Sequence, residues 1–367
     1  MAKPSDPFVL FRDDPAGRDV LFEQPSAIIS ADMPGAFYKA LETAEAARRD
    51  GKWLAGYFSY EAGYLLEPKL VPLLPKGRRT PLVCLGVFDA PSDSVPPRAP
   101  AAPSNGPIFD AQAAWTFADY EKRFNRLHGH LRAGDCYQGN LTFPIHAHWT
   151  GEPLAAFEAL TARQPVKYGA LVDLGGPVVL SRSPELFFEI GRDGWIETHP
   201  MKGTAPRGAT KGEDIRLREE LRNDVSLISE VGTLDVPELF RIESYPTLHQ
   251  MVSRVRAKLL PDLSIRDIFA ALFPCGSITG APKIRAMEIL HDLEGTPRDV
   301  YCGAIGWIAP GGPMRFSVAI RTISLFPNGE AVYNVGGGIV FDSTAEAEYQ
   351  ECLLKARYAT GTVPASN

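Results

Sequence analysis

One lysine stands where the sequence could present a nucleophile. Lys202 precedes Gly203 and Thr204, and it follows the run 195–198, whose alternating character predicts a short strand. Because Gly203 carries no Cβ, a small ligand could approach the lysine closely. In a pocket that lowers its pKa, the amine would become a nucleophile. An ordinary surface lysine at a strand end is the alternative interpretation.

Two acidic residues near the C-terminus have a spacing that suits a metal ion. Glu348 and Glu351 are three residues apart, so they share one face near the start of the last predicted helix. Three glycines at 336–338 come just before and allow close approach of a backbone or ligand. The pattern is typical of a Mg²⁺ site of carboxylate oxygens completed by water, and a solvated acidic face is the alternative. A capping box of Ser343 and Glu346 is expected at the start of this helix.

An arginine and a tight loop in the same third of the chain suit the binding of carboxylates. The run 315–323 alternates and predicts one strand, and an arginine among small residues on a sheet's inner face is typical of a carboxylate clamp. A surface salt bridge is the alternative. Residues 273–283 predict a loop at a helix N-terminus, whose amides also suit a carboxylate. The face expected to carry the clamp consists of Arg315, Ser317, Ala319 and Arg321.

Apolar periodicity predicts the elements that position these residues. Helices are expected at 35–49 and 117–132, the second ending at Gly134, and strands at 53–60, 137–143 and 168–174. The buried stripe of the second helix is Tyr120, Phe124, Leu127 and Leu131.

A change of composition divides the chain. Between residues 91 and 107 it shifts to Pro, Ala, Ser and Gly, which predicts a connector. We therefore expect an N-terminal part at 1–90, the connector at 91–107 and a region at 108–367 that carries the candidate residues above.

Bulk composition indicates an ordinary globular protein. The 367 residues are 45% apolar and 22% charged, and the net charge of −6 argues against a nucleic-acid binder. Neither a membrane-spanning apolar run nor a signal-peptide core is apparent in the sequence. The five cysteines are widely spaced and odd in number, which favours reduced thiols and predicts a cytoplasmic protein.

Seven short motifs occur together, at residues 53–64, 134–142, 181–187, 200–204, 276–283, 320–322 and 346–352. In these motifs and their order the chain resembles the chorismate-utilising enzymes, in particular component I of the aminodeoxychorismate synthases, which serve the para-aminobenzoate branch of folate biosynthesis. The resemblance implies an α+β fold similar to that of anthranilate synthase, with two subdomains whose antiparallel sheets pack around a central chorismate site. It also makes residues 108–367 the expected chorismate-binding catalytic region.

The resemblance also implies catalytic roles. Lys202 matches the lysine that attacks C2 of chorismate and displaces the C4 hydroxyl, after which ammonia adds at C4 and releases the lysine. Anthranilate synthases have a non-nucleophilic residue there, so that ammonia adds at C2 directly. Glu185 matches a proposed acid/base for the departing hydroxyl, a role that requires burial to raise its pKa.

Further residues match binding positions of the family. Glu348 and Glu351 match carboxylates that bind Mg²⁺, which would neutralise the ring carboxylate of chorismate. Ammonia is expected from a separate glutamine amidotransferase subunit (component II) or from solution, because no cysteine lies in a glutaminase setting. The expected product is aminodeoxychorismate. The matching substrate-binding residues are Gly203, Thr204, Ser277, Arg321 and Gly338.

The sequence departs from the family between Arg207 and Val231. The family has a helix there, then a segment with another Mg²⁺ carboxylate, then an Arg-Asn-Asp turn, whereas this chain has room for only one of the first two. Either Glu213 takes the place of the missing carboxylate or the metal-bearing segment is absent, and the short spacing favours absence.

Two other functions remain open on the sequence. The first is that of a related enzyme, either anthranilate synthase component I or an isochorismate or salicylate synthase. The second is that of a non-catalytic subunit that binds chorismate or tryptophan, which the shortened segment makes plausible.

Overall fold

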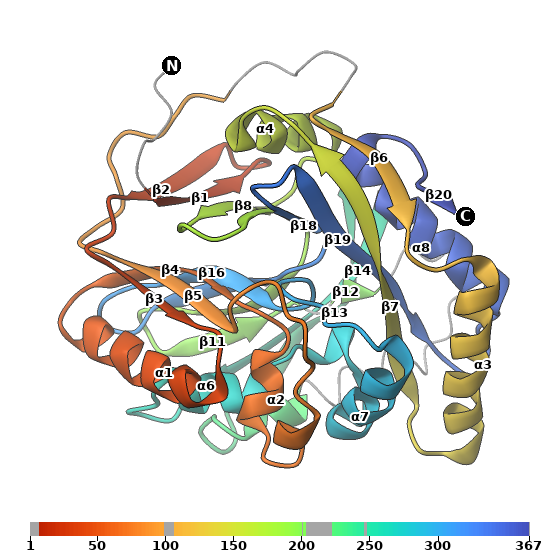
Figure 1. Ribbon diagram of the computed structural model, residues 1–367. Helices are drawn as coiled ribbons and strands as arrows, with labels where there is room; N and C mark the ends of the chain where they lie inside the picture. The colour runs from red at the N-terminus through yellow and green to blue at the C-terminus, as the bar shows by residue number, and fades with distance from the viewer. Residues whose placement is uncertain (1–6, 99–105, 200, 203–221, 246–247, 367) are drawn as a thin grey trace.

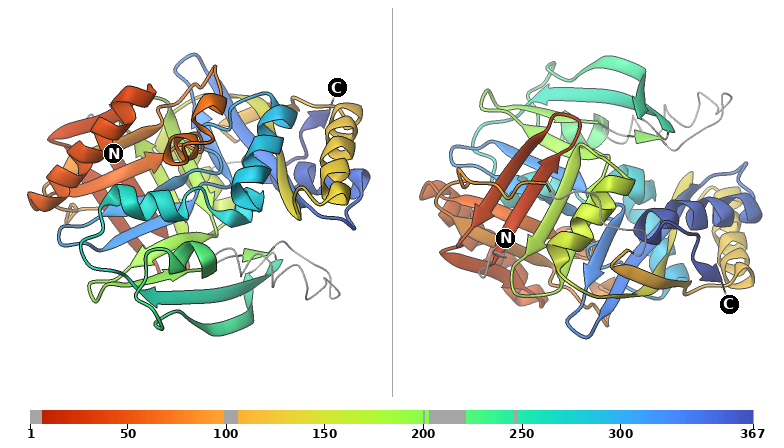
Figure 2. Two further views of the ribbon diagram at one scale, coloured as in Figure 1. Left: turned by 90° about the horizontal axis from the view of Figure 1, so that it is seen from below. Right: turned by 90° about the horizontal axis from the view of Figure 1, so that it is seen from above.

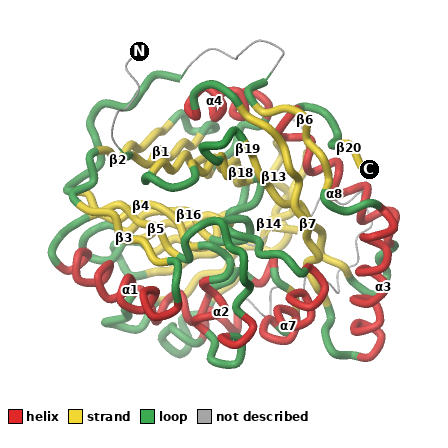
Figure 3. Tube along the Cα trace, viewed as in Figure 1, coloured by secondary structure: helices red, strands yellow, loops and turns green. Residues whose placement is uncertain are grey.

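Two large β-sheets stacked face to face form the centre of the protein. The computed structural model describes residues 7–98, 106–199, 201–202, 222–245 and 248–366. At 201–202, 238–245, 248–253 and 366 it describes the main chain alone. Strands occupy the middle of the molecule and helices lie on the outside (Figures 1 and 3). In the described part of the chain, none of the helices is both long and apolar enough to span a bilayer.

The first sheet, sheet A, is antiparallel except for one pair at its edge. Its order is β2-β1-β8-β9-β18-β19-β7-β6-β20, and β15 also pairs with β7. Among the described strand pairs of this sheet, β20 and β6 alone run parallel. The strands are β1 (Phe8–Asp13), β2 (Arg18–Glu23), β6 (Ile108–Ala113), β7 (Gln138–Trp149), β8 (Tyr168–Asp173), β9 (Val178–Ser183), β15 (Gly280–Ala281), β18 (Thr322–Leu325), β19 (Glu330–Ile339) and β20 (Ala365–Ser366).

The second sheet, sheet B, is antiparallel throughout its described pairs. Its order is β12-β14-β11-β10-β17-β16-β4-β5-β3, with β13 on β14. The β13–β14 hairpin lies at one edge of the molecule (Figure 2). The strands are β3 (Ala27–Ala31), β4 (Trp53–Phe58), β5 (Val83–Phe88), β10 (Leu186–Ile190), β11 (Trp195–Thr198), β12 (Met201–Lys202), β13 (Asp235–Tyr245), β14 (Leu248–Lys258), β16 (Ala304–Ile308) and β17 (Met314–Val318).

Helices cover the outer faces of both sheets. Helices α1 and α6 pack on sheet B, with α2 beside α6, while α4 and α8 pack on sheet A with α3 beside α8. Helix α7 packs on β7 and against α3. The bounds are α1 (Pro34–Arg49), α2 (Ala62–Leu66), α3 (Phe117–Ala133), α4 (Pro153–Arg163), α6 (Ile265–Leu272), α7 (Lys283–Glu294), α8 (Ala345–Thr360), and the 3₁₀ turns η1 (Val71–Leu73) and η2 (Gly276–Ile278).

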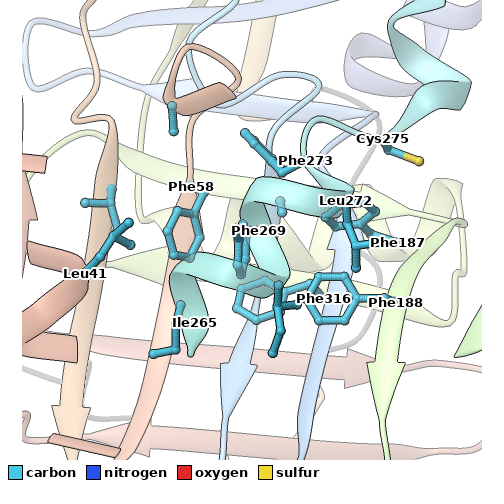
Figure 4. Close-up of a cluster of buried hydrophobic side chains, with 14 of the residues drawn as sticks. Leu41, Phe58, Phe187, Phe188, Ile265, Phe269, Leu272, Phe273, Cys275 and Phe316 are labelled. Atoms are coloured by element: carbon cyan, nitrogen blue, oxygen red, sulfur yellow. The ribbon is translucent and has the colours of Figure 1, made fainter. Parts of the chain in front are cut away.

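Apolar side chains fill three layers. One cluster lies between the sheets and includes Val9, Phe22 and Tyr57. A second joins sheet A to α3, α4 and α8. The third joins sheet B to α1, α2 and α6, and at its centre the rings of Phe58 and Phe269 lie 4.0 Å apart beside Phe316 (Figure 4). Helices and sheets therefore bury one face each against a common core.

The long helices follow the sequence prediction closely. Helix α3 buries Tyr120, Phe124, Leu127 and Leu131, as the periodicity predicts. Its N-terminus is held by a capping box of Thr116 and Asp119, and Gly134 ends it at a left-handed φ of 79°. The predicted strands at 53–60, 137–143 and 168–174 are confirmed as β4, the first half of β7 and β8, with bounds that differ by one or two residues.

The segment before the connector contributes to both sheets. Strands β1 and β2 join sheet A, whereas β3, β4 and β5 join sheet B. Later parts of the chain also alternate between the two sheets, so residues 1–90 and 108–367 share one fold.

The predicted single strand at 315–323 is wrong. Strand β17 ends at Val318 in sheet B, and β18 begins at Thr322 in sheet A. Between them the chain turns through Arg321, which has a left-handed φ of 51°. The alternation of apolar and polar residues indicates which face of a sheet each side chain takes, but not which sheet the strand joins. It therefore cannot predict that the chain passes from sheet B to sheet A here.

Candidate active site

The chain crosses between the sheets twice at one place. Residues 184–185 connect β9 to β10, and residues 319–321 connect β17 to β18. The two connections are joined by backbone hydrogen bonds, from the Arg182 N–H to the Arg321 carbonyl at 2.9 Å and from the Val318 N–H to the Glu185 carbonyl at 3.1 Å. The fold therefore places Glu185 and Arg321 on adjacent backbone at the junction of the sheets.

Glu185 meets the loop that carries Ser277. Only 3% of Glu185 is exposed, and its Oε1 accepts a hydrogen bond from Ser277 Oγ at 2.8 Å. Ser277 Oγ also lies 3.2 Å from the Cys275 sulfur. Two residues 92 positions apart in the sequence thus form one contact, as a shared site requires. A carboxyl hydrogen-bonded in a closed setting can exchange a proton with a reacting group beside it.

Behind this loop lies a buried polar network. The Arg298 guanidinium donates to both oxygens of Glu294, at 2.9 and 2.7 Å, and lies over the ring of Tyr60. Glu294 Oε1 accepts from the Thr142 N–H at 2.9 Å, and Glu61 Oε1 accepts from the Arg298 N–H at 2.7 Å. Sequence reasoning missed this network. One available signal was Glu294 itself, an acidic residue at a helix C-terminus, where the helix dipole disfavours it unless it is paired.

The glycines of β19 have different neighbours on its two faces. Gly338 pairs in register with Asn140 of β7, and a Cβ on Gly338 would lie 2.8 Å from Gln138 Nε2. A Cβ on Gly337 would lie 2.8 Å from Glu348 Oε2. The missing side chains leave room for the Gln138 amide on one face and for the Glu348 carboxylate on the other.

Glu348 and Glu351, the acidic pair at the start of α8, are held by contacts other than the predicted capping box. The capping box of Ser343 and Glu346 is wrong, because Thr344 is the N-cap and no side chain caps the helix. Ser343 Oγ instead donates to Glu348 Oε1 at 2.6 Å. Glu351 pairs with Lys355 Nζ at 2.9 Å, and that amine also donates to the Gly336 carbonyl at 3.1 Å. Lys355 is a further residue that sequence reasoning missed, although its i, i+4 spacing from Glu351 could have indicated it.

The acidic pair fits part of a Mg²⁺ shell. The described residues contain no group of three or more metal-ligating side chains. Mg²⁺ nevertheless needs only one or two protein carboxylates when water and a substrate anion supply the other oxygens. Glu348 has the right donor atoms and faces a glycine instead of a side chain. These two carboxylates thus suit a site that is completed when a substrate binds.

Lys202 is described at the main chain only. Its backbone forms β12 and pairs with Met251 of β14. Gly203, Thr204 and Glu213 lie outside the described residues, as does most of the shortened segment after Arg207. At the end of that segment, burial raises the pKa of Asp224, whose carboxylate lies 2.6 Å from Lys283 Nζ.

The loop before α7 uses some of its amides internally. The Ile278 N–H donates to the Cys275 carbonyl at 3.2 Å, and the Thr279 N–H to the Gly276 carbonyl at 3.3 Å. These two amides are therefore engaged within the loop and do not contribute to the carboxylate-binding nest that the sequence predicted. The Ser277 hydroxyl is what the loop presents to Glu185.

The chain is similar in sequence to a described protein family and to several named enzymes. Residues 6–361 match the sequence pattern shared by the chorismate binding enzymes. The chain belongs to this family. It is 38% identical to aminodeoxychorismate synthase component 1 of Salmonella typhimurium over 69% of this chain and 60% of that protein. The corresponding Escherichia coli protein is also 38% identical, over 67% of this chain and 58% of that one. Anthranilate synthase component 1 of Pseudomonas aeruginosa is 35% identical, over 70% and 55%.

Solved structures in the family share the architecture. Anthranilate synthase component I of Streptococcus pneumoniae superposes with a TM-score of 0.80 at 23% identity, over 98% of this chain and 93% of that one. The expected α+β fold with two antiparallel sheets, similar to that of anthranilate synthase, is confirmed. The aligned region of this chain corresponds to 58–60% of the length of the aminodeoxychorismate synthase component 1 relatives it matches.

Proposed function

We propose that this protein aminates chorismate to 4-amino-4-deoxychorismate in para-aminobenzoate formation. The observation that carries the proposal is the buried Glu185–Ser277 contact at the junction of the sheets, because it joins two of the residues expected at a chorismate site. Relatives named aminodeoxychorismate synthase component 1, at 38% identity, support this choice among the reactions of the family.

The strand register supports a position for Lys202 near that contact. Strands β10 and β11 pair Glu189 with Glu197. On β14, strand β12 continues the register of β11, with Thr198 opposite Val255 and Lys202 opposite Met251, and β10 is the next strand beside β11. A strand-end amine next to a buried carboxyl is the arrangement that nucleophilic attack and protonation of a leaving group would need.

Each residue then has one task. The Lys202 amine attacks C2 of chorismate, the ring double bond shifts, and the C4 hydroxyl leaves with a proton from Glu185 as water. Ammonia next attacks C4, the double bond shifts back, and the lysine amine leaves from C2. The net reaction exchanges the hydroxyl for an amino group, with water as the second product.

Binding residues hold the substrate in place during these steps. Arg321 supplies a cation for a carboxylate, and Ser277 orients Glu185 through its hydroxyl. Gly203, Thr204 and Gly338 would let the backbone approach the ring closely. Glu348 and Glu351 would hold a Mg²⁺ ion, which when bound supplies positive charge to the ring carboxylate.

Ammonia would come from a glutamine amidotransferase subunit, with free ammonium as a substitute in the test tube. The name component 1 carried by the relatives supports a second component. All five cysteines are buried and unpaired, which suits a reducing compartment such as the cytoplasm.

Product analysis tests the proposal and distinguishes it from the related reactions of chorismate. The protein is incubated with chorismate, Mg²⁺ and ammonium, and the products are resolved chromatographically. Aminodeoxychorismate is the expected product. Anthranilate would favour an anthranilate synthase component I, a function that the relatives at 35–36% identity support. Isochorismate or salicylate would favour an isochorismate or salicylate synthase. Absence of any product with intact chorismate binding would favour a non-catalytic subunit.

Replacement of the lysine tests the covalent step. Lys202→Ala is expected to lower the amination rate on the order of 10³-fold or more, because the nucleophile is lost. Lys258→Ala, on the same sheet with its amine bonded to the Asp193 carbonyl, is the matched control and should change the rate less than about twofold. An amination rate in Lys202→Ala within tenfold of the parent would remove the covalent mechanism.

A further inference from the structure

A single guanidinium contacts the backbone on both sides of the candidate site. Arg298 Nη1 donates to the Ile278 carbonyl at 2.9 Å, and Ile278 is the residue after Ser277. Arg298 Nη2 donates to the Asn140 carbonyl at 2.7 Å, and Asn140 is the register partner of Gly338. The loop that carries Ser277 and the strand beside Gly338 are thus joined through one side chain.

The arginine is itself held rigidly. It is 2% exposed, and its charge is balanced by both oxygens of Glu294. Its ring neighbour is Tyr60, whose centroid lies 4.3 Å from the guanidinium carbon. Because a planar guanidinium bonded on several edges has little freedom, the two carbonyls it contacts are fixed relative to each other.

The loop depends on these contacts for its placement. Besides the Arg298 bond, the Thr279 carbonyl accepts from the Asn140 N–H at 2.8 Å, and Ala281 pairs with Gln138. Ser277 stands at the other end of this short stretch, where its hydroxyl reaches Glu185. A shift of about 1 Å in such a loop would misalign that hydroxyl and can cost on the order of 10²-fold in rate.

We propose that Arg298 is a positioning residue. It fixes the loop 276–281 against β7 and so sets where Ser277 presents its hydroxyl to Glu185 and to the substrate. This role rests on the proposed function for its effect on catalysis, whereas its effect on the loop can be observed independently of any activity.

Two replacements test the role on the full chain. Arg298→Met removes all the contacts of the guanidinium, and Arg298→Lys keeps the charge next to Glu294 but cannot bond both carbonyls in the same plane. Arg12→Met is the matched control, because Arg12 is also a buried arginine, 1% exposed, that pairs with Glu158 and lies over Phe157. It belongs to β1 and not to the 276–281 loop or to β7. All three are compared by urea unfolding, by amination kinetics, and by hydrogen exchange of a peptide spanning 274–282.

Both Arg298 variants are expected to lower kcat roughly 10- to 100-fold while KM for chorismate changes less than about threefold. The 274–282 peptide should exchange roughly 5- to 10-fold faster than in the parent. Arg12→Met should lose stability but keep the parent's kcat and the parent's exchange in this peptide.

The outcomes separate the two proposals. A parent without amination activity counts against the proposed function, and the exchange of the 274–282 peptide then decides the role of Arg298. An Arg298→Lys protein whose kcat and loop exchange match those of Arg12→Met would overturn the positioning role. So would a failure of both Arg298 variants to fold, since the arginine would then serve the stability of the whole protein.

Discussion

At the junction of the sheets, Glu185 is 3% exposed and bonded to Ser277, and the Arg298 network lies behind that loop. At the start of α8, the Glu351 side chain is 43% exposed, and the partners of the acidic pair, Ser343 and Lys355, lie on the same stretch of chain. The first region is held by residues distant in sequence and the second by near neighbours. The fold itself therefore arranges Glu185, the proposed proton donor, whereas the proposed metal ligands Glu348 and Glu351 depend on what binds to them.

The largest effect is expected at the junction. Glu185→Gln keeps the shape and an oxygen acceptor for Ser277 but cannot donate a proton to the leaving hydroxyl. The amination kcat should fall by roughly 10²- to 10⁴-fold with little change in chorismate binding. Steady-state kinetics with ammonium and calorimetric binding of chorismate measure the two quantities.

Glu189→Gln is the matched control for this change. Glu189 lies four residues along the chain and pairs with Arg315 at 2.6 Å on a partly exposed surface. Its replacement should alter kcat less than about twofold. Equal losses in the two variants would show that Glu185 acts through the strand and not through its proton.

A smaller effect, which excess metal reverses, is expected at α8. Glu348→Gln removes one anionic oxygen donor and should raise the Mg²⁺ concentration for half-maximal activity by about 10- to 100-fold. Saturating Mg²⁺ should restore much of the rate, unlike in Glu185→Gln. Glu346→Gln, on the exposed side of the same helix, serves as the control, and an unchanged Mg²⁺ requirement in Glu348→Gln would remove Glu348 from the metal site.

The smallest effect concerns stability. Burial, with a contribution from the nearby Asp299 charge, raises the pKa of Glu61 to about 8, above its ordinary value of 4.5. Between pH 4.5 and about 8, Glu61 keeps its proton in the folded protein but has lost it in the unfolded chain. The contribution of Glu61 to the free energy of unfolding therefore falls as pH rises from about 5 to 8.

Glu61→Gln should remove this dependence. The stability of the parent relative to Glu61→Gln is expected to fall by about 1 kcal/mol per pH unit over that range, as measured by urea unfolding at pH 5.5, 6.5 and 7.5. Parallel pH profiles for the two proteins would mean that Glu61 is already ionised in the folded state.

Much of the local structure could be predicted because its causes are local. Helix α3 has its stripe, its N-cap and its glycine end within nineteen consecutive positions, 116–134. The candidate residues Glu185, Ser277, Arg321 and Gly338 could be identified from motifs, but their contacts could not. The contact of Ser277 with Glu185 and that of Arg298 with Glu61 join residues 92 and 237 positions apart, which periodicity does not report.

By itself the sequence determined helices α1 and α3, several strands including β4, β7 and β8, the residue types of the site and their resemblance to chorismate binding enzymes. Caps, periodicity and short motifs could show these because they depend on neighbours along the chain. Tertiary structure alone decided that the run after Arg315 leaves one sheet for the other, that Ser343 serves Glu348 instead of a helix end, and that a buried arginine ties the Ser277 loop to β7. Those outcomes depend on which strands pair and which polar groups are buried together, and burial requires each such group to find a partner wherever in the chain that partner lies.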